Sequence, residues 1–85
     1  MDINRKKALG LAAARRITFG SDQTGILSWY KAYSNVKTDV ERCQIPKLSL
    51  PKGYDQQHTQ CKLQKWKAVI RDIESESLEY LTAFD

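Results

Sequence analysis

Four polar side chains in the N-terminal half of the chain could contact the edges of DNA bases: Gln23, Thr24, Ser28 and Lys31. A glutamine can form paired hydrogen bonds with adenine, and a lysine can donate to guanine or to a phosphate. Such contacts require the segment FGSDQTGILSWYKAY to be the turn and second helix of a helix-turn-helix, because the early residues of that helix enter the major groove. The sequence therefore suggests a DNA-binding, helix-turn-helix-like unit over residues 8–33.

The two halves of this unit fit the motif unequally. Gly20 can supply the turn, and the helix expected after it has a clear apolar stripe. In the tight form of the motif a small residue stands four positions before the turn glycine, but here that position is Arg16 and the small residue is Ala14. Either the turn is longer than usual or the motif is absent.

Basic side chains on the preceding segment are candidates for phosphate contacts: Arg5, Lys6, Lys7, Arg15 and Arg16. Each such contact would release counterions and steepen the salt dependence of binding. On this hypothesis the protein is a small basic regulator that binds DNA through its first two helices and dimerises through its third.

The charge distribution along the chain has two interpretations. The net charge of +4 divides into +4 for residues 1–20, zero for 21–43, +4 for 44–72 and −4 for 73–85. The basic body could attract an anionic polymer. Alternatively, the acidic end could fold back on the basic segments.

A second function class is a non-enzymatic protein-binding module, such as an inhibitor, adaptor or antirepressor. Apolar residues of the C-terminal segment advance by alternating steps of three and four, which predicts one face of a long helix. That face could dock against a partner or a second copy of the chain. Its candidate interface residues are Leu63, Trp66, Ile70, Tyr80 and Phe84. RNA binding by stacking on Trp29, Tyr30 or Tyr33 is less favoured, because these rings lie on a stripe expected to be buried.

Catalysis, metal binding and a cofactor are not indicated. His58 and Cys61 are three residues apart, but no carboxylate or oxyanion feature accompanies them. A structural zinc site needs four ligands, and Cys43 supplies only one more. We expect reduced cysteines and a cytoplasmic protein. The longest apolar run, ALGLAAA, is too short to span a membrane, and the basic opening lacks the amphipathic face of a transit peptide.

Periodicity predicts an all-α fold in a single domain of residues 1–85. Three helices are expected near residues 4–17, 22–43 and 56–83, with a Pro-containing connector at 44–55. Small residues around Gly10 predict close packing of the first helix on a neighbour. The expected core consists of Leu9, Ile26, Trp29, Tyr33, Val36, Val40, Leu63, Trp66, Ile70 and Ile73.

The expected third helix has its charges arranged against its own dipole. Lys62, Lys65, Lys67 and Arg71 occupy its N-terminal half, and its acidic residues follow. A helix dipole favours the opposite order. The arrangement suggests a basic zone for an anionic partner, or else simply exposed charges that cost little individually.

Overall fold

The computed structural model describes residues 2–17, 25–54 and 61–82 and contains three helices. These are α1 (Ile3–Ala14), α2 (Ile26–Glu41) and α3 (Lys62–Leu81). No strand occurs in the described residues, so the predicted all-α class is confirmed. None of the helices within these ranges is long and apolar enough to cross a bilayer.

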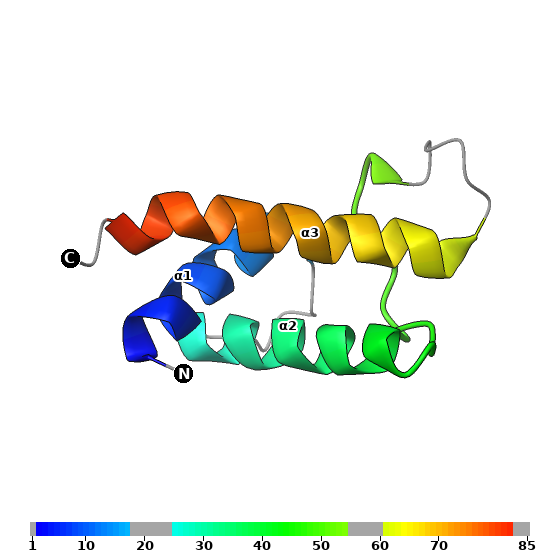
Figure 1. Cartoon of the computed structure of the whole chain (residues 1–85), viewed down its shortest axis with the longest axis horizontal. Helices are drawn as coiled ribbons and strands as arrows, with labels where there is room; N and C mark the ends of the chain where they lie inside the picture. Colours follow the sequence, from blue (N-terminus) through cyan, green and yellow to red (C-terminus); the bar gives the residue numbers. More distant parts are fainter. Residues whose placement is uncertain (1, 18–24, 55–60, 83–85) are drawn as a thin grey trace.

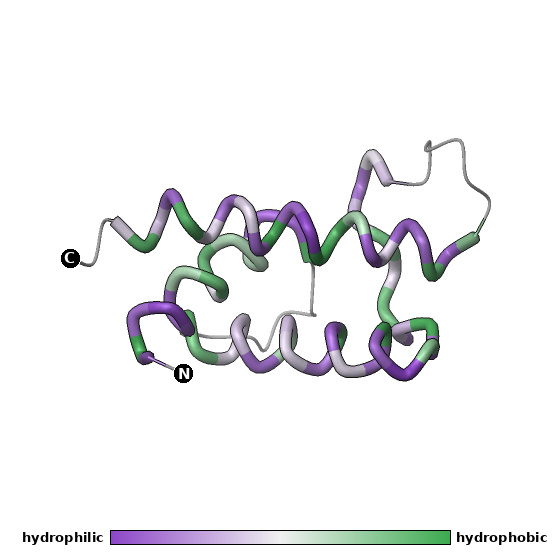
Figure 2. Tube along the Cα trace, viewed as in Figure 1, coloured by the Kyte–Doolittle hydropathy of each residue, from purple (hydrophilic) through white to green (hydrophobic). Residues whose placement is uncertain are grey.

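The three helices do not form a bundle of equal neighbours. α2 and α3 run antiparallel, and the short α1 packs against both of them at one end (Figure 1). α2 and α3 make far fewer contacts with each other than either makes with α1. α1 is apolar beyond its first turns (Figure 2), because most of its length lies between two partners. The domain measures 39 × 26 × 23 Å.

The core is centred on α3. Trp66, Val69 and Ile73 are almost fully buried, and Ile17 lies with them just beyond the end of α1. Most of the predicted core is buried, but Leu63 is only partly buried against it, and Ile26 and Trp29 are half-buried. The small residues of α1 contribute more than expected, because their size lets two helices approach at once. The buried set is Ala8, Leu9, Ala12, Ala13, Ile17, Ala32, Tyr33, Val36, Val40, Trp66, Val69, Ile70 and Ile73.

At Gly10, α1 and α2 lie in close contact. The Cα of Gly10 faces the backbone of Ile26, the first residue of α2. Glycine normally weakens a helix interior, but here any side chain would collide with the neighbouring backbone. The predicted close packing through small residues is therefore confirmed.

The ends of α2 differ from the predicted 22–43. Gly25 has φ +93° and is the N-cap, so the helix begins at Ile26. It ends at Glu41, because Cys43 adopts a left-handed conformation with φ 57°. The amide of Cys43 donates to the carbonyl of Val40, and the amide of Gln44 donates to that of Asp39. This is a Schellman motif, with cysteine in the position that glycine usually takes.

α3 begins at Lys62, where a helix from residue 56 was predicted. Cys61 is an extended N-cap without a side-chain hydrogen bond. Residues 56–60 and 83 of the predicted helix lie outside the described ranges. The helix is shorter at its start than predicted because the apolar spacing only begins at Leu63.

The connector after α2 leads toward α3 and packs on the core through Leu48, Leu50 and Tyr54 (Figure 1). Near its end, the amide of Tyr54 donates to the carbonyl of Pro51 at 3.2 Å. Gly53 has φ +98°, as the third residue of a type II turn requires. Lys52 and Gly53 are therefore the central residues of this turn, which directs the Tyr54 ring toward the helices.

Candidate functional site

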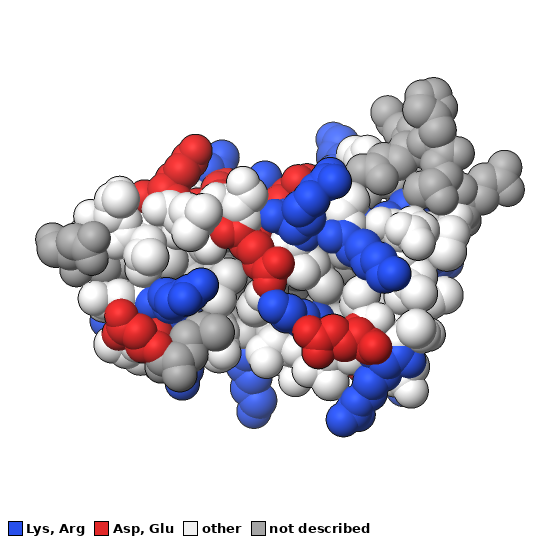
Figure 3. All heavy atoms as spheres, in the orientation of Figure 1, with Lys and Arg blue, Asp and Glu red and all other residues white. Residues whose placement is uncertain are grey.

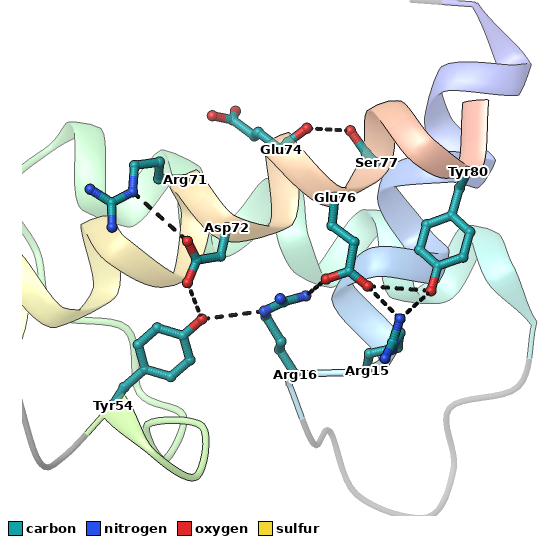
Figure 4. Close-up of polar contacts among 9 residues, drawn as sticks. All are labelled: Arg15, Arg16, Tyr54, Arg71, Asp72, Glu74, Glu76, Ser77 and Tyr80. Atoms are coloured by element: carbon teal, nitrogen blue, oxygen red, sulfur yellow. Dashed lines mark hydrogen bonds and ion pairs between the residues drawn. The ribbon is translucent and has the colours of Figure 1, made fainter. Parts of the chain in front are cut away.

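Two consecutive arginines just beyond α1 converge on one carboxylate of α3 (Figure 4). Arg15 Nη1 lies 2.7 Å from Glu76 Oε1, and Arg16 Nη1 contacts Glu76 Oε2. The Arg15 side chain is 64% exposed, and that of Arg16 is 25% exposed. Glu76 therefore accepts from both guanidinium groups, one on each oxygen.

Two tyrosine hydroxyls extend this cluster. Arg15 Nη1 donates to the Tyr80 hydroxyl at 2.8 Å, and Arg16 Nε donates to the Tyr54 hydroxyl at 3.2 Å. The Tyr54 hydroxyl in turn donates to Asp72 Oδ2 (Figure 4). The network thus joins the end of α1, the connector and α3.

The pKa directions keep Glu76 and Arg16 charged at neutral pH. Burial raises the pKa of Glu76, but the hydrogen bond from Arg16 and the charges of both arginines outweigh this effect. The pKa of Glu76 therefore lies below its usual value. Burial lowers the pKa of Arg16, yet its bonds to Glu76 and Tyr54 raise it overall. Burial and the bond to Asp72 raise the pKa of Tyr54, which stays protonated.

The acidic half of α3 makes a second interhelical contact, with α2. Glu74 Oε2 accepts from the Tyr33 hydroxyl and from Lys37 Nζ, each at 2.6 Å. Burial raises the pKa of Glu74, but these two bonds lower it below its usual value. Two of the anions in the C-terminal half of α3 therefore face cations: Glu74 pairs with Lys37 of α2, and Glu76 pairs with the arginines just beyond α1.

Of the two interpretations of the charge distribution, the second applies to Arg15 and Arg16, because an acidic residue of the C-terminal segment packs against both of them. Both were predicted to contact phosphate, and both are ion-paired to Glu76. On the face drawn in Figure 3, basic and acidic side chains are interspersed and form no continuous basic patch. Sequence reasoning could not identify this pairing because the partners are about sixty residues apart.

The other predicted phosphate contacts lie at the start of α1. Arg5 is exposed, and Lys6 and Lys7 are half-exposed. Lys6 Nζ lies 5.7 Å from the centre of the Tyr30 ring, which brings these basic residues beside the first turns of α2. They form no ion pair within the described parts of the chain.

The connection between α1 and α2 departs from the tight helix-turn-helix. That motif joins its helices by three or four residues, whereas residues 15–25 separate α1 from α2 here. Gln23 and Thr24, two of the four predicted base contacts, lie outside the described residues and precede the start of α2. The longer connection follows from Gly25, whose positive φ keeps α2 from beginning earlier.

The remaining two predicted base contacts, Ser28 and Lys31, line a groove. It is enclosed by one side of α2 and by the first part of the connector, with a volume of about 600 Å³. Along α2 it extends for roughly 17 Å, given the rise of 1.5 Å per residue. We call it the α2 groove; its walls are Ser28, Lys31, Ala32, Asn35, Val36, Asp39, Gln44, Ile45, Pro46, Lys47 and Leu48.

The predicted interface on α3 is mostly used within the domain itself. Trp66 is 1% exposed and Ile70 is 7% exposed, so both belong to the core and are not surface anchors. Leu63 packs against that core, and Tyr80 is half-buried beside Arg15. Phe84 lies outside the described residues. The stripe is covered because α1, α2 and the connector all contribute to the core that contains it.

Within the described residues, no three His, Cys, Asp or Glu side chains lie close enough together to hold a metal ion. Cys43 and Cys61 are exposed and not joined by a disulfide. His58 lies outside these residues.

Comparison with known proteins gives no relative: no protein-family model, no curated protein and no solved structure matches the chain.

Proposed function

We propose that this domain is a non-enzymatic binding module that accepts a peptide segment of another protein in the α2 groove. The observation that carries the proposal is the groove itself, which combines an apolar floor with a polar rim. Ala32, Val36 and Leu48 provide apolar lining. Ile45 stands at its edge with 54% of its surface exposed. A concave site with apolar lining and a few polar groups is the usual form of a ligand-binding site.

The charges of the groove define the chemistry of the segment. Lys31 and Lys47 line it together with a single carboxylate, Asp39. An acidic segment with one or two aliphatic or aromatic side chains would match this lining, because apolar anchors supply affinity and opposite charges supply orientation. The shape of the groove also favours a narrow ligand, because the connector closes one side of it. Ser28 and Lys31, which were expected to contact DNA bases, lie in this groove beside the connector.

A display library of random peptides tests this proposal, because it samples many different segments for binding at once. We expect selection against the wild-type domain to enrich peptides that carry acidic and large apolar residues. Their affinity should fall at least about tenfold in the Ile45→Asp variant, since one buried apolar anchor contributes that much or more.

Leu27→Asp is the matched control, because Leu27 is similarly exposed at 48% and lies on α2 outside the groove. Its affinity for the selected peptides should stay within about twofold of wild type, as expected for a residue outside the contact. Equal binding by wild type and Ile45→Asp, or the absence of any enriched peptide, would contradict the proposal.

DNA binding is the second candidate, and the position of Lys6 favours it. Lys6 lies over the ring of Tyr30, and Tyr30 directly precedes Lys31 in the sequence. Arg5 and Lys7 flank Lys6 on α1. These four cations form no ion pair within the described residues and could contact phosphates together.

Fluorescence anisotropy with a mixed-sequence duplex at low and physiological salt tests this candidate. Replacing Arg5 and Lys7 by Gln should weaken binding and reduce its salt slope by about two, one for each cation removed from a phosphate. Arg15 and Arg16 are less suitable for this test because they connect α1 to α3. No binding at low salt would exclude this candidate.

A further inference from the structure

A second hollow adjoins the arginine cluster. It has a volume of about 290 Å³ and is lined by Arg15, Arg16, Ser49, Leu50, Pro51, Lys52 and Tyr54. Three of these residues are cationic and none is acidic. The carboxylates of Asp72, Glu76 and Glu79 line a separate hollow that shares the same two arginines. The two arginines therefore line one hollow together with acidic residues and another without them.

The two guanidinium groups retain hydrogen-bond donors beyond those the network uses. Each guanidinium has five N–H donors. Arg15 donates to Glu76 and Tyr80, and Arg16 donates to Glu76 and Tyr54. Within the described residues, the other N–H groups of both arginines have no hydrogen-bond acceptor. A ligand in the basic hollow could therefore accept from both side chains without displacing Glu76.

The same network holds these donors in place. A guanidinium bound to a carboxylate and a hydroxyl has few accessible rotamers, so less side-chain entropy is lost when it binds a ligand. The turn from Pro51 to Tyr54 fixes the main chain of Lys52, its second residue, beside the hollow. The hydroxyls of Ser49 and Tyr54 add neutral polar groups to the lining.

We propose that the hollow between Arg15, Arg16 and Lys52 binds a phosphate monoester group. Arginine pairs bind phosphate oxygens through paired N–H donors. Three cations favour the doubly charged monoester over a singly charged diester. Glu76 binds both guanidinium groups but does not line this hollow, and it acts as a positioning residue for them. This site is separate from the α2 groove and rests on neither candidate function above.

Titration with phenyl phosphate, followed by ¹H–¹⁵N NMR at constant ionic strength, tests the site. We expect saturable shifts of the Arg15 and Arg16 Nε–H signals and of the backbone amides around Lys52. Lys52→Gln should weaken binding roughly tenfold, as the loss of one charge-assisted hydrogen bond implies. Lys52 is exposed, so the variant should keep the wild-type spectrum elsewhere.

Lys62→Gln is the control for charge, because it removes one exposed cation from α3, outside the hollow. It should leave phenyl phosphate binding within about twofold of wild type, since a distant exposed charge is screened. Equal weakening in both lysine variants, or shifts that do not saturate or that chloride reproduces, would overturn the site.

Dimethyl phosphate is the diester probe. Binding of it as tight as that of phenyl phosphate would overturn the assignment to a monoester and point to a nucleic-acid backbone.

Discussion

Gly10 of α1 lies directly against the main chain of Ile26 in α2. A Cβ atom at position 10 would be 2.3 Å from the Ile26 carbonyl oxygen and 2.8 Å from its Cγ2. The first of these neighbours is backbone and cannot rotate away. This contact sets how closely the two helices approach.

Gly10→Ala should therefore lower the free energy of unfolding by about 1–2 kcal/mol, despite the better helix propensity of alanine. Urea denaturation followed by circular dichroism measures the change. If stability instead rises by up to about 1 kcal/mol, as propensity alone predicts, the close contact does not exist in solution.

The left-handed conformation of Cys43 predicts a stabilising substitution. Cys43→Gly should raise the free energy of unfolding by about 0.5–1 kcal/mol, because glycine adopts this backbone conformation without strain. The gain is reduced by the greater flexibility of glycine in the unfolded chain. Thermal and urea denaturation under reducing conditions measure it.

Cys43→Ala separates the backbone effect from loss of the thiol. Alanine keeps a Cβ atom and its strain, so its stability should match that of wild type. A gain of equal size in both variants would mean that the thiol, and not the backbone, is responsible.

Tyr54→Phe removes the hydroxyl that connects Arg16 to Asp72. We expect the free energy of unfolding to fall by about 1–2 kcal/mol, because one donor and one acceptor lose their partner. Tyr30→Phe is a suitable control, since Tyr30 is half-buried but its hydroxyl forms no hydrogen bond within the described residues. Equal effects of the two substitutions, measured by urea denaturation, would argue against the network.

Acidification should destabilise the domain through Glu76 and Glu74. Their pKa values are lowered in the folded state from the usual 4.5. The unfolded chain therefore binds protons first, and the stabilisation present above pH 4.5 is lost as the pH falls toward the folded-state pKa values. Urea denaturation midpoints between pH 6 and about 3 follow this loss.

Glu76→Gln should reduce this pH dependence, because one of the two groups no longer titrates. Glu79→Gln should leave it close to that of wild type, since Glu79 lines the same acidic hollow but forms no ion pair within the described residues. The same acid profile in wild type and Glu76→Gln would show that Glu76 is not paired in solution.

Much of the architecture follows from local patterns in the sequence. The spacing of Trp66, Ile70 and Ile73 predicts both a helix and its buried face, and the pair Lys52-Gly53 predicts a turn in the connector. The helix ends were less predictable. A cysteine in the left-handed position and an N-cap glycine are decided by packing and backbone energetics that periodicity does not contain.

The candidate site was less predictable still. Arg15 and Arg16 were identified as functional candidates, but their pairing with Glu76 depends on which residues meet across the fold. The exposure of Trp66 was ambiguous for a similar reason, because an apolar stripe fits a core and an interface equally well. No sequence pattern marked Lys52 as a candidate binding residue, because only the folded turn that contains it places it beside the arginines.

The position of α1 between the other two helices also constrains when the chain can fold. During synthesis α1 and α2 emerge first, but α1 has much of its apolar surface committed to α3, which emerges last. The early chain can thus build only a partial core without Trp66, Val69 and Ile73. Contacts such as that of Arg16 with Glu76 close a long loop, which slows folding relative to a bundle of sequential neighbours. We therefore expect a nascent chain without α3 to remain sensitive to protease on the ribosome.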